Sequence, residues 1–139
     1  MKTLLVMAAV ISYFGVYPGK MTGGWKDCSP EESKIKDFAK AAASNISQSS
    51  NSLYHSKMFC VTNAKSQVVS GIKYKIVFEM GPTVCKKNKA NINIESCEPL
   101  EYSHPQTCSI TVWDQPWRSS TKFYFEPCTP HVENKCNRG

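Results

Sequence analysis

The run QVVSGIKYKIVFEM, residues 67–80, carries the clearest structural signal in this chain of 139 residues. After Gly71 every second position is apolar: Ile72, Tyr74, Ile76, Phe78 and Met80. This period of two predicts a strand over residues 71–80, with one face on a core and the other mostly in water. Residues 53–65 predict a less regular strand before it, so we expect a hairpin with Gln67–Gly71 at or near its tip. Gly71 suits this place because tight turns often need backbone angles that glycine adopts freely.

Upstream of this hairpin the sequence predicts one amphipathic helix. Ser29 is expected to cap it, with Pro30 at the first helical position and Glu32 completing a capping box. Apolar side chains then recur at helical spacing on one face: Ile35, Phe38, Ala39, Ala42 and Ile46. The polar residues 48–52 predict that the helix ends near Ser47.

Downstream, a second hairpin is expected. Residues 108–113 and 121–126 alternate between apolar and polar side chains, and residues 114–120 join them. Residues 81–105 are rich in Pro, Asn, Lys and Ser, which predicts a long excursion between the two hairpins. One helix and two antiparallel hairpins indicate an α+β fold, an antiparallel sheet wrapped around one long helix.

Residues 1–19 are typical of a secretory signal peptide. Lys2 precedes a mainly apolar run over residues 4–16. The alternative, a membrane anchor, is disfavoured because a span takes about 20 apolar residues. Small residues place the cleavage between Gly15 and Lys20. Residues 20–139 then form one secreted, extracellular domain, with residues 129–139 as a short C-terminal tail.

The chain is basic, with a formal net charge of +6. Its dense basic cluster along the sequence is Lys86, Lys87 and Lys89. A solvated loop is favoured there over a nucleic-acid or heparin site, because no aromatic residues interleave with the lysines. We therefore expect neither a nucleic-acid nor a membrane partner.

Seven cysteines in a secreted chain of this size imply a disulfide framework with one cysteine left over. No C-x-x-C pair is present and the histidines are scattered, so no metal site is expected. A Cys–His protease needs a larger scaffold, and a small hydrolase needs a triad that the sequence lacks. The chain is therefore predicted not to be an enzyme and to need no cofactor.

Three segments of small or apolar residues offer neither a general base nor a metal ligand: residues 21–24, 67–71 and 116–117. Together they predict a surface that fills a cleft. Each also has an ordinary explanation: Trp117 as a core residue, Val68 and Val69 as strand ends, and Gly23-Gly24 as an unstructured tail.

Taken in order with Cys85, Cys97, Cys108 and Cys128, these segments resemble the type 2 cystatins, tight-binding inhibitors of papain-like cysteine proteases. The resemblance runs from Gly23 to Cys128. It implies a wedge that blocks the cleft of a papain-like protease, such as a cathepsin, reversibly and without covalent chemistry. The wedge residues would be Met21, Thr22, Gly23, Gly24, Gln67, Val68, Val69, Ser70, Gly71, Pro116 and Trp117.

Within this wedge Trp117 is the natural anchor, since buried tryptophans dominate interface energetics. Thr22 stands where the family often has a bulky aliphatic residue, so the arm is expected to contact its pocket weakly. Trp25 stands where the family commonly has proline, which leaves the arm either less rigid or packed back onto the body. A monomer is expected. The alternative function is a binding module or toxin-like effector that keeps this fold without inhibiting proteases.

The resemblance also implies the disulfides Cys85–Cys97 and Cys108–Cys128. A third bond, Cys28–Cys60, is expected because the fold brings the start of the helix and the first long strand together. Cys136 would then be free or pair between chains.

A second inhibitory edge is also open. Some cystatins inhibit legumain through an asparagine in the loop after the helix, and Asn51 stands at the matching place. The alternative is an ordinary asparagine in a polar turn. Asn45-Ile46-Ser47 is a glycosylation sequon on the predicted helix, where Ile46 is expected to face the core.

Overall fold

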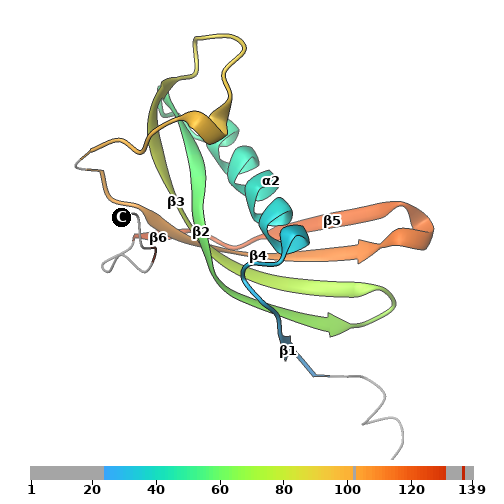
Figure 1. Cartoon of the computed structure of the whole chain (residues 1–139). Coiled ribbons are helices and arrows are strands. Elements are labelled where there is room, and N and C mark those ends of the chain that lie inside the picture. Colours follow the sequence, from blue (N-terminus) through green and yellow to red (C-terminus); the bar gives the residue numbers. More distant parts are fainter. Residues whose placement is uncertain (1–23, 102, 131–135, 137–139) are drawn as a thin grey trace, which may run out of the picture.

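One helix lies across one face of a curved antiparallel sheet in the computed structural model, which describes residues 24–101, 103–130 and Cys136 (Figure 1). This is the predicted α+β architecture. The elements in chain order are β1 (Lys26–Asp27), α2 (Ser33–Ser49), β2 (Tyr54–Val68), β3 (Ile72–Lys86), the 3-10 turn η1 (Ile94–Ser96), β4 (Gln106–Gln115), the 3-10 turn η2 (Pro116–Arg118), β5 (Ser120–Phe125) and β6 (Thr129–Pro130).

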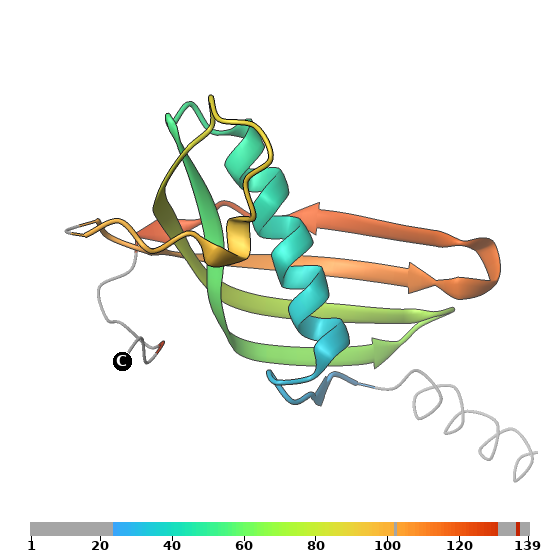
Figure 2. The ribbon, with the colours of Figure 1, turned by 45° about the horizontal axis from the view of Figure 1, so that its top comes forward.

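The strands follow the order β1-β2-β3-β4-β5, and each neighbouring pair is antiparallel. β6 also pairs with β4, next to the part that pairs with β5. The two predicted hairpins are therefore β2–β3 and β4–β5. Their tips project to the same side of the molecule, to the right in Figures 1 and 2. The sheet thus brings two loops together that are far apart in the sequence.

The helix buries the face that its spacing predicted. Ile35, Ala39 and Ala42 are fully buried, while Phe38 and Ile46 pack against the margin of the core. The sheet contributes alternating buried side chains from β3 and β4: Tyr74, Ile76, Phe78, Met80, Cys108, Ile110 and Val112. Full burial of a large apolar side chain contributes about 1.5–3 kcal/mol, so this layer is the main source of stability.

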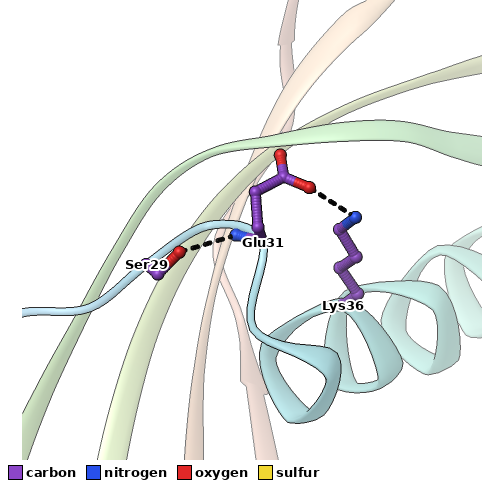
Figure 3. Close-up of polar contacts among 3 residues, drawn as sticks. All are labelled: Ser29, Glu31 and Lys36. Atoms are coloured by element: carbon purple, nitrogen blue, oxygen red, sulfur yellow. Dashed lines mark hydrogen bonds and ion pairs between the residues drawn. The ribbon is translucent and has the colours of Figure 1, made fainter.

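The helix begins later than predicted. α2 starts at Ser33, and its N-cap residue Glu32 makes no side-chain capping hydrogen bond. Ser29 instead closes a turn around Pro30: its carbonyl accepts from Glu32 N–H at 3.2 Å and its hydroxyl from Glu31 N–H at 3.2 Å (Figure 3). Proline favours the second position of such a turn, so these residues form a turn before the helix and no capping box. The Glu31 carboxylate pairs with Lys36 at 2.7 Å.

β3 runs beyond its predicted end, through residues 81–86, where an excursion was expected. Past Met80 it no longer pairs with β4, and Pro82 lies on this unshared edge. Proline is tolerated there because it need not donate to a neighbouring strand. The excursion is tied back to this edge, since Leu100 N–H donates to Pro82 O at 3.0 Å and Val84 N–H to Glu98 O at 2.9 Å.

Three disulfides are present among the described residues. Cys85–Cys97 and Cys108–Cys128 are the pairs that the resemblance implied. The third bond joins Cys60 to Cys136, and Cys28 is free. The expectations of a Cys28–Cys60 bond and of an unpaired Cys136 were therefore wrong.

The register of β1 against β2 explains this correction. Asp27 lies opposite Lys65, and Cys28 N–H donates to Ala64 O at 2.9 Å. Cys28 is thus level with Ala64, four residues along β2 from Cys60, which is about 13 Å at strand spacing. A disulfide joins Cα atoms that are roughly 4.4–6.8 Å apart, so Cys28 cannot reach Cys60. The tail brings Cys136 to Cys60 instead, with a Cα–Cα distance of 5.8 Å.

The predicted signal peptide, residues 1–19, lies outside the described residues. Among the residues that the structure does describe, α2 and the 3-10 turns are all too short or too polar to cross a bilayer.

Candidate functional site

The tip of the β2–β3 hairpin is a three-residue loop. Val68 and Ile72 form the last strand pair, and Val69 N–H donates to Gly71 O across the loop at 2.9 Å. Ser70 and Gly71 both have positive φ, 43° and 108°. Glycine adopts the second angle without strain, which confirms that Gly71 lies in the turn.

Gly71 also allows the two hairpin tips to touch. A Cβ atom at this position would lie 2.5 Å from the backbone oxygen of Asp114 and 3.2 Å from the ring of Trp117. The first of these distances is far inside van der Waals contact, and a backbone oxygen cannot rotate away. Only glycine therefore lets the first tip lie against the second.

Hydrogen bonds hold the two tips in this arrangement. The indole N–H of Trp113 donates to the carbonyls of Val69 and Ser70, at 3.2 and 3.3 Å. The side-chain amide of Gln115 donates to Ser70 O at 3.0 Å, and Gln115 is buried. β4 thus satisfies the loop carbonyls of β2–β3, so the two tips form one unit.

The tip of the β4–β5 hairpin is the short 3-10 turn η2. Ser119 closes it with a left-handed backbone angle and donates its N–H to Pro116 O at 3.0 Å. The turn presents Trp117 to solvent, and 63% of this residue is exposed. The alternative that Trp117 is a core residue is therefore wrong.

The two tips, which approach each other at Gly71, both carry exposed apolar residues. Val68 is 70% exposed and Val69 is 36% exposed. Apolar side chains that cluster on a surface mark interaction sites in many proteins. The two tips thus form an exposed apolar ridge, here defined as Val68, Val69 and Trp117.

The N-terminal end of α2 braces the second tip. The ammonium of Lys34 pairs with the Asp114 carboxylate at 2.9 Å, and the Thr121 hydroxyl donates to the same carboxylate at 3.3 Å. The hydrogen bond between the Lys34 ammonium and the Asp114 carboxylate raises the pKa of Lys34 above its ordinary value of 10.5. The side chains are 47% and 13% exposed, so water screens the pair only in part.

The predicted N-terminal arm is partly described. Met21, Thr22 and Gly23 lie outside the described residues. Gly24 has nothing within 4 Å of a Cβ atom built on it, and β1, which follows, pairs with Lys65 and Ser66 near the first tip. Trp25 lies over the outer face of the sheet in a depression of about 300 Å³ that Lys65 and Lys75 also line. The chain therefore enters the domain beside the first tip, with Trp25 packed back onto the body.

Asn51 lies at the other end of α2. It is exposed in the loop between α2 and β2. Lys87 holds this loop: its ammonium donates to Ser47 O at 2.6 Å, to Ser50 O at 3.0 Å and to Ser50 Oγ at 3.2 Å. Sequence reasoning placed Lys87 in a solvated basic loop and missed this role.

The glycosylation sequon Asn45-Ile46-Ser47 lies on the last turns of α2. Asn45 is exposed, but Ser47 is buried, and the Ser47 hydroxyl accepts a hydrogen bond from Ser56 N–H at 2.9 Å.

One group of potential metal ligands was found within the described part of the chain: Cys60, Glu79 and Cys136, with ligand atoms within 4.8 Å of one another. The two sulfurs are bonded to each other, so they offer no thiolate to a metal. The group is a disulfide beside a buried carboxylate.

The supporting residues Trp113, Gln115, Asp114 and Lys34 were not predicted. The alternating pattern of residues 108–113 placed Trp113 on a strand. Its hydrogen-bond partners in the first tip could not be predicted, because they depend on the register between β3 and β4. The residues that sequence reasoning did select at 67–71 and 116–117 lie together at one end of the sheet.

The chain belongs to the cystatin family. The cystatin domain matches residues 23–117. Cystatin-1 of Chilobrachys guangxiensis is 41% identical over 129 residues, covering 92% of this chain and 95% of that protein. U7-hexatoxin-Hi1a of Hadronyche infensa is 42% identical over 101 residues, covering 72% and 93%. The crystal structure of Al-CPI matches with a TM-score of 0.71 and 28% identity, covering 78% of this chain and all of that one. Members of this family are protease inhibitors and not enzymes.

Proposed function

We propose that this protein is a secreted, reversible inhibitor of papain-like cysteine proteases. The observation that supports the proposal is the joined pair of hairpin tips. Trp113 and Gln115 hold the first tip against the second, while the apolar ridge of Val68, Val69 and Trp117 remains exposed. This ridge has the character of a plug for an apolar groove.

The proposed mechanism is occlusion. Burial of the ridge in the pockets of a protease cleft stabilises the complex by about 25 cal/mol per Å² of apolar surface. The hydrogen-bonded tips are already ordered, so little conformational freedom is lost on binding. No covalent bond is made or broken, so the protease regains its activity when the inhibitor dissociates.

The segment before Gly24 acts as a third contact in this proposal. β1, which begins two residues after Gly24, pairs with Lys65 and Ser66 near the first tip, and no atom lies within 4 Å of a Cβ built on Gly24. Deleting the chain through Gly23 should weaken binding mainly through faster dissociation, because most changes within one interface act on the off-rate. An unchanged off-rate would show that the N-terminal segment, with Thr22 in place of a bulky aliphatic residue, contributes nothing to binding.

The direct test is a titration of papain with the oxidatively folded protein, residues 20–139, while a small peptide substrate is hydrolysed. Tight, reversible inhibition that competes with substrate supports the proposal. Absence of inhibition by a sample with three intact disulfides would favour a binding or toxin-like role, in keeping with the name of the relative U7-hexatoxin-Hi1a. Mass spectrometry after thiol labelling provides the folding control, since only Cys28 should react.

A second candidate function is legumain inhibition through Asn51. It is favoured by the exposure of Asn51 in a loop that Lys87 holds at three acceptor atoms. An exposed asparagine on a fixed loop could enter the pocket of an asparagine-specific protease in an extended form. The same protein preparation should then inhibit legumain without competing for papain.

A further inference from the structure

We propose that the outer face of the sheet, opposite α2, binds a sulfated polysaccharide. This face is separate from the apolar ridge and from the Asn51 loop. Four lysines on three strands, β2, β3 and β5, form its centre, here called the lysine face: Lys65, Lys73, Lys75 and Lys122.

The strand register brings these lysines together. Lys65 lies opposite Lys75, and the row continues through Thr111 to Tyr124. In the adjacent row Lys73 lies opposite Trp113, which lies opposite Lys122. Partners across an antiparallel pair share a face, and the intervening residues Tyr74 and Ile76 are buried under α2. The four lysines therefore all point away from the helix, over a span of about 16 Å across four strands.

Among the residues that the structure describes, no ion pair neutralises these charges: the ion pairs found there involve Lys34, Lys36 and Lys40. One carboxylate lies in the two rows, that of Asp27 opposite Lys65, against four lysines. Lys65 and Lys75 directly face each other, which is unfavourable for like charges. An arrangement that costs stability and leaves positive charge uncompensated is one that an anionic ligand would stabilise.

Aromatic rings hold part of the lysine face in place. The ammonium of Lys73 lies 5.2 Å from the ring centre of Trp113, and that of Lys122 lies 5.9 Å from it. Cation–π contacts of this kind restrict the lysine side chains, so less freedom is lost when they bind an anion. Beside this row, Trp25 is 43% exposed at the depression that Lys65 and Lys75 line, where its ring can pack on a sugar.

The chemistry favours a sulfated polysaccharide over other polyanions. A single-stranded nucleic acid would stack its bases on free aromatic faces, but the Trp113 ring is already engaged by two ammonium groups. A membrane surface would be favoured by exposed aliphatic side chains beside the lysines, whereas these rows carry polar and aromatic ones. A sulfated chain needs only closely spaced cations, and a flat sheet face supplies them.

The test measures binding of the folded protein to size-defined heparin fragments at several salt concentrations. The variant Lys65→Gln/Lys75→Gln should bind about 25-fold more weakly, roughly fivefold for each lysine. The slope of log affinity against log salt should fall by about 2, as for other polyelectrolytes. The melting temperature should not fall, because the two lysines repel each other. This unchanged stability separates lost contacts from lost folding.

The matched control is Lys86→Gln/Lys89→Gln, which removes the same charge from the end of β3, as much as about 36 Å from Lys75. Its heparin affinity should stay within about twofold of the parent, since salt screens charges at that distance. Equal losses in both variants would show that net charge alone governs binding and would overturn the proposal. Tighter binding to phosphatidylserine vesicles, to oligothymidylate or to fully desulfated heparin would overturn the choice of ligand. Papain inhibition is measured in parallel, so failure of heparin binding is distinguishable from failure of the inhibitory function.

Discussion

The two ends of α2 are each tied to a loop by one lysine, but the loops are built in different ways. At the first end Lys34 pairs with Asp114, and the loop it braces is one of two tips that also bond to each other. At the second end the Lys87 ammonium binds neutral oxygens of the Asn51 loop, and local hydrogen bonds such as that from the Ser50 hydroxyl to Ser47 O, at 2.9 Å, also hold this loop. The helix of 17 residues separates the two ends by about 25 Å.

This difference indicates how each end should respond to substitution. The paired tips depend on contacts between residues 45 positions apart, such as Gln115 with Ser70. A change in one tip should therefore disturb the other. The Asn51 loop is held by Lys87 and by hydrogen bonds within residues 47–56, so it should behave independently of the tips.

The variant Asn51→Ala is expected to have the largest effect. If the ends are independent, this variant should lose all measurable legumain inhibition, because the side chain that the enzyme would read is gone. Papain inhibition should be unchanged. Asn45→Ala, another exposed asparagine of the same region, is the control and should inhibit both enzymes normally. Parallel loss of both activities in Asn51→Ala would mean that the two ends are not separate sites.

Gly71→Ala should give the next largest effect. The added Cβ would overlap the Asp114 carbonyl at 2.5 Å and would force a φ of 108° on a residue that avoids it. The tips must then separate, which we expect to cost about 3 kcal/mol, or roughly 100-fold in the papain inhibition constant. Gly81→Ala is the matched control, because its added Cβ would also crowd a neighbour, the Phe59 ring at 2.8 Å, but far along β3 from the tips. Equal inhibition by the two variants would show that contact between the tips is dispensable.

Trp117→Ala tests the ridge without changing the backbone. Loss of an exposed interface anchor should weaken papain inhibition by about 2 kcal/mol, or roughly 30-fold, while the melting temperature stays the same. Leu53→Ala removes an even more exposed apolar residue, 76% exposed, at the opposite end. It should leave papain inhibition intact. An unchanged inhibition constant for Trp117→Ala would remove this residue from the proposed interface.

The sequence predicted local features of this molecule well. Alternation over residues 71–80 and helical spacing from Ile35 to Ile46 each identified the buried face, because side-chain direction repeats with the backbone period. The hairpin tip at Gly71 was predictable from the same logic. The resemblance to the cystatins supplied Cys85–Cys97 and Cys108–Cys128.

Features that depend on strand register or on the path of a tail were not predictable. Cys60–Cys136 requires the tail to return to the middle of β2, which no local pattern encodes. The lysine face was not predicted because its members are dispersed in the sequence, whereas Lys86, Lys87 and Lys89 are close neighbours in it. A slip of one residue in register would turn each of these side chains to the other face. The bonds from Trp113 to the first tip were hidden for the same reason.

The smallest effect is expected from the brace at the first end, and its pH dependence tests whether that brace is ionic. The folded-state pKa of Lys34 is raised, chiefly by its hydrogen bond to Asp114, so the pair stabilises the fold while Lys34 is protonated. This contribution is complete below pH 10.5, the ordinary lysine value, and is lost as the pH rises through the higher folded-state pKa. Because Lys34 is 47% exposed, solvent reduces the contribution to about 1 kcal/mol or less.

Lys34→Met should therefore be less stable to urea than the parent at neutral pH, and the difference should shrink above pH 10.5. Lys34→Arg supplies the control, because a guanidinium stays charged throughout this range and should keep its advantage over Lys34→Met at every pH. Equal stability of the parent and Lys34→Met at neutral pH would mean that the apolar part of the side chain, which methionine retains, carries the stabilisation. The first end of α2 would then be held by packing, and the two ends would not differ in having an ionic contact at one and hydrogen bonds to neutral oxygens at the other.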